Sequence, residues 1–133
     1  MPRPFLLMLA LSDHHRGSCV TTCIAQAFKI EPKAVEAMLI LAGEDKPSLG
    51  ANFFVCKKVI NALGRVTSWR KPRYQANKAG INYTQLALTL DNENVIVHFT
   101  EHLSHLEKGT IRDSFVVLNR SYLTKKPKGW WIL

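Results

Sequence analysis

Three residues of the types that carry out acyl transfer, Cys19, His102 and Asp113, lie at positions where they can act together. Cys19 follows Ser18, a favourable helix N-cap, and opens the segment 19–28, which predicts a helix. The unpaired N–H groups and the positive dipole of a helix start stabilise a thiolate and lower a cysteine pKa below its free value of about 8.5. A thiolate beside an imidazole performs acyl transfer, and a carboxylate orients the imidazole.

The imidazole and the carboxylate lie on a predicted β-hairpin, residues 102–114, whose turn is centred on Lys108 and Gly109. In that register the alternation of side chains places His102 and Asp113 on one face as diagonal neighbours. Their Cα atoms are then about 7–8 Å apart, which allows the long side chains to meet. A one-residue bulge at Gly109 would change this register.

The elements that must position these residues are predicted as helices first and strands last. Helices are expected at 19–28, 31–43, 52–64 and 83–90, strands at 65–69, 94–99 and in the hairpin, and a loop at 70–82. Gly43 and Gly64 are expected to end their helices. This order predicts the α+β class, with N-terminal helices packed on a C-terminal antiparallel β-sheet. We expect one domain over residues 1–133, with a basic aromatic tail at 120–133.

Two segments carry a resemblance to the papain-like cysteine peptidases. SCVTTCIAQAFKIEPKAVEAMLILAG resembles the nucleophile helix and the following helix of that fold. NVIVHFTEHLSHLEKGTIRDS resembles the strand, His strand, Gly turn and Asp strand of small bacterial and phage members, including bacteriocin-processing-type domains. The similarity covers roughly residues 12–115 and implies a compact papain-like fold.

The resemblance implies a catalytic triad in which Cys19 is the nucleophile, His102 the general base and then acid, and Asp113 the orienting residue. It implies a peptidase or amidase that acts on a peptide or protein substrate and needs no cofactor. Papain-like enzymes usually supply a Gln shortly before the cysteine to bind the oxyanion, whereas this chain has none there. His14, His15 or a backbone N–H are the alternatives for that role. A catalytically inactive papain-like binding protein is therefore an alternative function.

The net charge of +8 supports a second alternative. The excess of cations is most visible at 70–78 and 120–131, and both segments mix cations with aromatic residues. This mixture suits contacts to phosphates together with stacking on bases. The alternatives are a basic nucleic-acid-binding protein, or weak electrostatic binding of nucleic acid alongside another activity.

Cysteine and histidine spacing also allows a structural zinc site. Cys19 and Cys23 are four residues apart on a predicted helix, and His98 and His102 are four apart in sequence, which together offers a Cys₂His₂ ligand set. The simpler interpretation makes Cys23 and Cys56 small buried hydrophobic residues and His98 a structural histidine. Under that interpretation no metal is expected.

Composition also bears on the compartment. Three cysteines cannot form a complete set of disulfides, which favours a reducing, intracellular setting. No apolar run approaches the roughly 18 residues of a membrane helix, and we interpret PFLLMLAL near the N-terminus as a buried segment and not as a signal peptide. We expect a cytoplasmic protein with no membrane partner. Its small size and basicity suggest a phage or other viral origin, hence the host cytoplasm.

Overall fold

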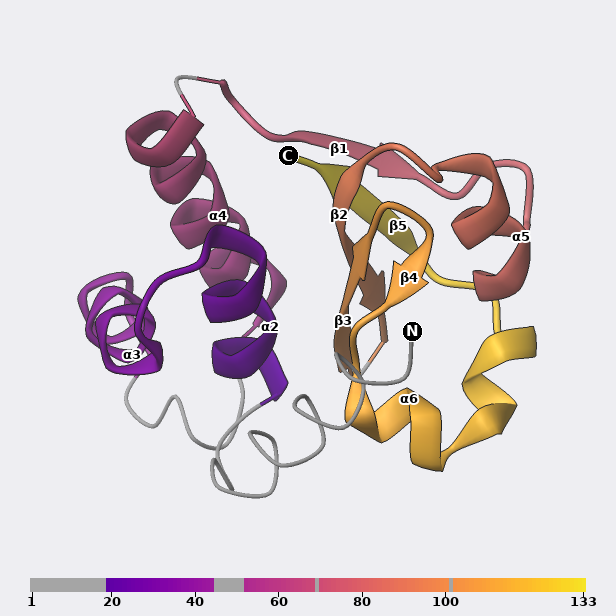
Figure 1. Ribbon diagram of the computed structural model, residues 1–133. Helices are drawn as coiled ribbons and strands as arrows, with labels where there is room; N and C mark the ends of the chain where they lie inside the picture. Colours follow the sequence, from indigo (N-terminus) through magenta and orange to yellow (C-terminus); the bar gives the residue numbers. More distant parts are fainter. Residues whose placement is uncertain (1–18, 45–51, 69, 101) are drawn as a thin grey trace.

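The computed structural model describes residues 19–44, 52–68, 70–100 and 102–133. Its elements are α2 (Cys19–Phe28), α3 (Pro32–Leu41), α4 (Phe53–Ser68), β1 (Arg73–Ala76), α5 (Tyr83–Thr89), β2 (Asn94–Phe99), β3 (His102–Glu107), β4 (Thr110–Ile111), α6 (Ser114–Leu118), a 3₁₀ turn (Arg120–Thr124) and β5 (Gly129–Ile132). Helices α2, α3 and α4 lie on one side of the sheet, and α5 and α6 lie on the other (Figure 1). The chain is an α+β protein, as its sequence predicts.

The sheet has five antiparallel strands in the order β1-β5-β2-β3-β4. Strand β5 lies between β1 and β2, with Trp131 opposite Tyr74 on one side and Trp130 opposite Val97 on the other. The end of the predicted basic tail is therefore a central strand. This strand order places β1 beside β5, so Gln75 lies opposite Trp130.

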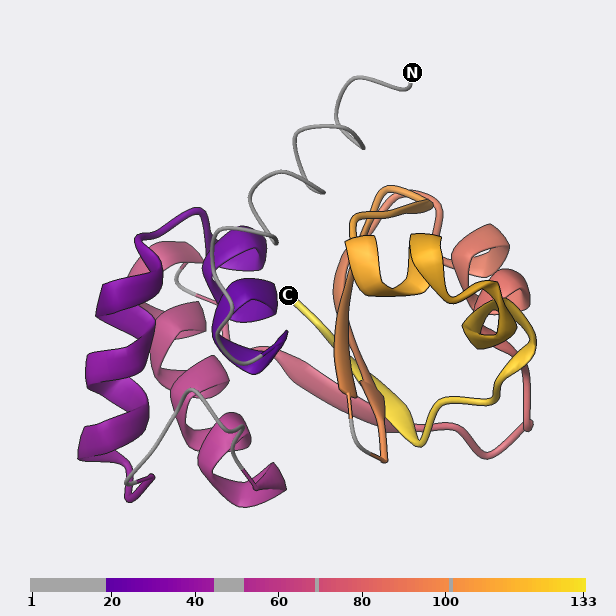
Figure 2. The ribbon, with the colours of Figure 1, turned by 90° about the horizontal axis from the view of Figure 1, so that it is seen from below.

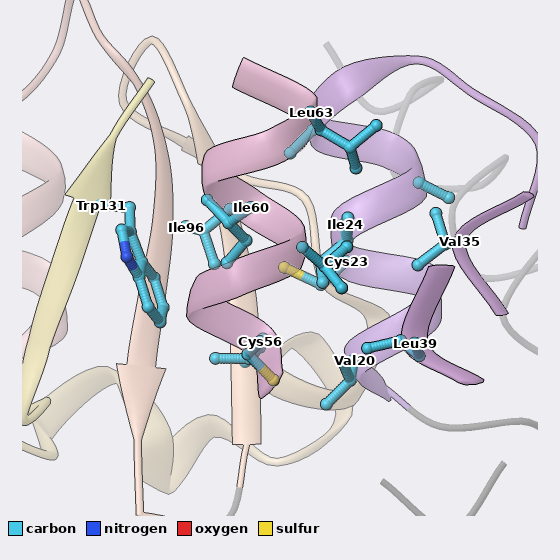
Figure 3. Packing of buried hydrophobic residues seen from close by; sticks show 14 of the residues in the cluster. Val20, Cys23, Ile24, Val35, Leu39, Cys56, Ile60, Leu63, Ile96 and Trp131 are labelled. Carbon is cyan, nitrogen blue, oxygen red and sulfur yellow. The ribbon is translucent and has the colours of Figure 1, made fainter. Parts of the chain in front are cut away.

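Both faces of the sheet are buried, each against its own helices. Ile96 and Trp131 point toward α2, α3 and α4, whereas Val97 and Trp130 belong to the cluster beneath α5 and α6. The view from below shows the sheet standing between the two groups of helices (Figure 2). Ile60 of α4 lies beside Ile96 in the first cluster (Figure 3). This double coverage explains why β2 is almost continuously apolar instead of alternating.

Local signals define the ends of two helices. Pro32 begins α3, where its fixed φ suits the first turn, and Gly43 follows the helix at φ 118°, a region that favours glycine. Asn82 and Gln85 form a reciprocal capping box at the start of α5, with both hydrogen bonds at 2.8 Å.

Helix α4 corrects two predictions, since it runs through Gly64 and makes 65–68, the described part of the expected strand, helical. A Cβ on Gly64 would lie 2.3 Å from Cδ of Pro72. The glycine is therefore present for close packing against the chain that enters β1, and it does not stop the helix. Glycine has two structural uses here, and the local sequence does not distinguish them.

The predicted loop at 70–82 contains strand β1, which is a second correction. The segment Arg73–Ala76 has neither apolar alternation nor a run of β-branched residues, and most of it is exposed. Pairing with β5 makes it a strand, and this partner lies more than 50 residues further along the chain.

The hairpin forms as predicted at its turn and differs at its end. Lys108 and Gly109 both have positive φ, 50° and 79°, and Glu107 pairs with Thr110 without a bulge. Strand β4 stops at Ile111, however, and Asp113 begins helix α6 instead of continuing the strand.

None of the described helices is long and apolar enough to cross a membrane. The PFLLMLAL segment, Ser18, His14 and His15 lie outside the described residues.

Candidate active site

Cys19 is the first residue of α2, the helix that packs across strand β3. Its side chain is half-buried, and its thiol is free. The first N–H groups of a helix have no partner within the helix, so the sulfur lies at the positive end of the dipole. This is the environment the sequence predicts for the residue.

His102 is the first residue of β3 and is 7% exposed. Three aromatic rings surround its imidazole, with centroid distances of 4.8 Å to Phe115, 5.5 Å to Tyr122 and 6.5 Å to Phe99. These rings restrict the orientation of the imidazole and exclude water from one side of it. The start of β3 lies at the same end of the molecule as the start of α2 and helix α6 (Figure 1).

Asp113 holds the imidazole with one carboxylate oxygen and caps a helix with the other. Its Oδ2 lies 2.6 Å from Nε2 of His102. Its Oδ1 accepts hydrogen bonds from the N–H groups of Phe115 and Val116, at 3.0 and 3.4 Å. Asp113 is thus the N-cap of α6, and the helix fixes the carboxylate that fixes the imidazole.

The sulfur of Cys19 completes the arrangement by hydrogen bonding to the ring of His102. Because Nε2 is hydrogen bonded to Asp113, the ring nitrogen that bonds the sulfur is Nδ1. The backbone N–H of Leu103 also donates to the sulfur. The N–H of Arg112 donates to the carbonyl of His105, so the backbone groups of His105 point toward β4. Backbone groups alternate along a strand, so those of Leu103, two residues earlier, point toward the same edge of β3. Strand β4 does not extend that far, and the Leu103 N–H is therefore free to donate to the sulfur.

The two pKa shifts describe a thiolate–imidazolium pair. Burial alone would raise the pKa of Cys19, but the hydrogen bond and charge of His102 and the N–H of Leu103 lower it below its ordinary value. Burial would likewise lower the pKa of His102, but the hydrogen bonds and charges of Asp113 and Cys19 raise it to about 9. Both shifts favour the state in which the proton lies on the ring and the negative charge on sulfur.

The other two cysteines lack these partners. Burial is the main cause that raises the pKa of Cys23 well above its ordinary value, and it raises that of Cys56 to about 12. Both thiols therefore stay protonated at neutral pH. They lie in the core between α2 and α4, as expected for small buried hydrophobic residues (Figure 3).

The four residues of the zinc alternative do not gather around a common point. His98 faces the α4 side of the sheet, where its ring lies against Phe53 and Trp131 and its Nδ1 is 3.1 Å from the hydroxyl of Tyr74. His102 lies beside Phe99 on the other side and is engaged by Asp113. Within the described ranges, no three His, Cys, Asp or Glu side chains are placed to hold a metal ion. The described residues therefore give the zinc alternative no support.

Sequence reasoning did not find several groups that shape the site. Phe115 and Tyr122 surround His102, and the Leu103 N–H reaches the sulfur. The aromatic residues contribute because α6 and the following turn fold back under β3, which no local pattern shows. The signal that was available is Asp113 followed by Ser-Phe-Val-Val, because an aspartate before an apolar segment is typical of a helix start.

A buried, hydrogen-bonded series of thiol, imidazole and carboxylate can form and break acyl bonds, because it supplies a nucleophile, a proton carrier and a group that orients the carrier. No protein-family model, curated protein or solved structure matches the chain.

Proposed function

We propose that the chain is a compact papain-like cysteine hydrolase that cleaves an amide bond in a peptide or protein. The observation that carries the proposal is the hydrogen-bonded series from Cys19 at a helix start, through His102, to Asp113. The order of elements gives further support, since a cysteine helix packs on an antiparallel sheet that bears the histidine and the aspartate.

The geometry suits a two-step reaction. The Cys19 thiolate attacks the carbonyl carbon, and the His102 imidazolium gives its proton to the leaving nitrogen as the C–N bond breaks. The neutral imidazole then takes a proton from water, whose oxygen attacks the thioester. The C–S bond breaks, the acid leaves, and the thiolate–imidazolium pair is restored. Asp113 keeps Nδ1 turned toward sulfur throughout and stabilises the imidazolium.

A peptide library derived from a cell extract tests the proposal without a known substrate. The wild-type protein should create new peptide termini that mass spectrometry detects, and Cys19→Ala and His102→Ala should lose this activity by about 10³-fold or more. Cys23→Ala is the matched control and should retain cleavage. If wild type and Cys19→Ala give the same termini, the chain is not a cysteine hydrolase.

A further inference from the structure

The positive charge of the chain comes from one segment. Residues 46–90 contain eight Lys and Arg and neither Asp nor Glu. The chain has 18 cationic and 10 acidic residues in all, so the ten cations outside this segment are balanced by the ten acids there. The whole net charge of +8 therefore belongs to the segment that includes α4 and β1.

The fold closes this segment around a cleft of about 540 Å³ between α4 and β1. Lys57 and Asn61, one helical turn apart, line one wall, and Lys71, Arg73 and Tyr74 line the other. The three cationic side chains have no ion-pair partner in the part of the chain that the structure describes. No Asp or Glu lines the cleft.

The cleft also presents neutral donors and an aromatic ring. Trp131 lines it from below, fully buried, and its Nε1–H has no acceptor among the described residues. The side-chain oxygen of Gln75 accepts from Trp130 at 3.0 Å on the face of the sheet that packs against α5 and α6, so the Gln75 side chain points away from α4. The Tyr74 ring is half-buried and held by the hydrogen bond to His98. These groups are fixed before any ligand arrives.

We propose that the α4–β1 cleft binds single-stranded nucleic acid. Lys57, Lys71 and Arg73 contact phosphates, and a base lies against Tyr74 with Asn61 hydrogen bonding to its edge. An acidic peptide would engage the cations but would leave the Tyr74 ring and the Asn61 amide without a complementary partner. The site uses none of the groups at Cys19, so it stands or falls independently of the proposed hydrolase.

Fluorescence anisotropy with labelled oligo-dT and oligo-U tests this site. The wild-type protein should bind both, with affinity that falls steeply between about 50 and 200 mM salt. The variant K57Q/K71Q/R73Q should bind about tenfold or more weakly at low salt, and its log–log salt slope should be shallower by about 2, as expected from about −0.7 for each phosphate contact on a single strand.

The matched control is K33Q/R120Q/K126Q, which removes the same charge from exposed positions outside the cleft. It should keep most of the affinity and the slope, and circular dichroism should show that both variants are folded. An equal loss of affinity in the two variants would show that binding depends only on the overall charge of the protein, and it would contradict a binding site in the cleft.

Competition identifies the ligand class. Unlabelled oligonucleotide should displace the probe at much lower concentration of charge than poly-glutamate, inorganic phosphate or a free mononucleotide. Displacement by poly-glutamate at equal charge would assign the cleft to acidic peptides, and displacement by a mononucleotide at equal charge would assign it to free nucleotides; either result contradicts the proposal. Cys19→Ala should bind the oligonucleotides like wild type, which separates this outcome from that of the hydrolase.

Discussion

At the scale of single residues, the site depends on where one proton resides. His102 gains it because Asp113 and the Cys19 sulfur together outweigh the cost of burying a charged ring. Cys19 gives it up because His102 and the Leu103 N–H outweigh the burial of a thiolate. In the unfolded chain near pH 7.5, an ordinary thiol and a mostly neutral imidazole also hold about one proton between them. Folding thus favours transfer of the proton from sulfur to nitrogen.

Selective alkylation should reveal this proton transfer. Iodoacetamide at about pH 6.5 should label Cys19 first, because its thiol is the one whose pKa is lowered, whereas burial keeps Cys23 and Cys56 protonated. As pH falls, the rate at Cys19 should drop only below the free-cysteine range. His102→Ala should slow labelling by about tenfold or more. The variant removes the main group that lowers the pKa of Cys19, so burial should raise that pKa.

The labelled positions are read by peptide mass spectrometry on folded protein, with denatured protein as the reference in which all three cysteines react. Equal rates at the three cysteines of the folded protein, or no change in His102→Ala, would show that Cys19 is not an activated nucleophile.

Two substitutions should separate the two roles of Asp113. Asparagine is also a good N-cap, so Asp113→Asn should keep α6 and most of the stability. Its amide provides neither the charge nor the two acceptor oxygens that hold protonated His102, so cleavage should fall strongly. Asp113→Ala should lose the cap as well and cost about 1 kcal/mol more in the free energy of unfolding. Urea denaturation and kcat/KM, measured on both variants, test this; equal stability losses would contradict the division of roles.

At the scale of secondary structure, local chemistry predicted most of the elements, and pairing at long range created the others. A helix beginning at Cys19 and a tight turn at Lys108 and Gly109 follow from caps and turn residues within a few positions. Strand β1 does not, because Arg73–Ala76 becomes a strand only beside β5. The same reason hid the α4–β1 cleft, whose walls are ten or more residues apart in sequence and which Trp131 of β5 also lines.

Asp113 shows, at one position of the candidate site, which features the local sequence predicts and which it does not. Its distance from His102 follows from the hairpin register, so the sequence placed the carboxylate near the imidazole. The end of β4 and the start of α6 do not follow from that register, so the hairpin alone does not predict that Asp113 caps a helix. The structure assigns both roles to the same side chain.

Gly64 provides a prediction about how α4 and β1 pack. In an isolated helix Gly→Ala stabilises by up to about 1 kcal/mol. Here the new Cβ would lie 2.3 Å from the Pro72 ring, so Gly64→Ala should instead lower the free energy of unfolding by about 1–3 kcal/mol. Adding Pro72→Ala removes the ring atoms that clash and should recover part of this loss. Denaturant unfolding of both single variants and the double variant measures the coupling; additive losses would count against this contact.

At the scale of the whole molecule, β5 joins the two halves of the sheet. It pairs with β1 and β2 and supplies Trp130 to one core and Trp131 to the other. A chain that ends at Lys128 should therefore lose near-UV circular dichroism, and Cys19 should lose its selective reactivity because the sheet that carries His102 is no longer held. Trp130→Phe, which keeps the strand and a large apolar ring, is the control and should retain both signals. A truncated chain with native spectra would contradict this role of β5.

The central place of β5 also determines when the protein can fold as it is synthesised. Ala76 ends β1 and Gly129 begins β5, so at about 5–20 residues per second the ribosome needs about 3–10 s to supply the partner of β1. During that interval β2 lacks β5 as its neighbour in the sheet. The cationic segment, which includes β1, likewise lacks its strand partner while it is attached to the ribosome. Until β5 emerges, the nascent chain therefore exposes these surfaces to chaperones and to the RNA around it.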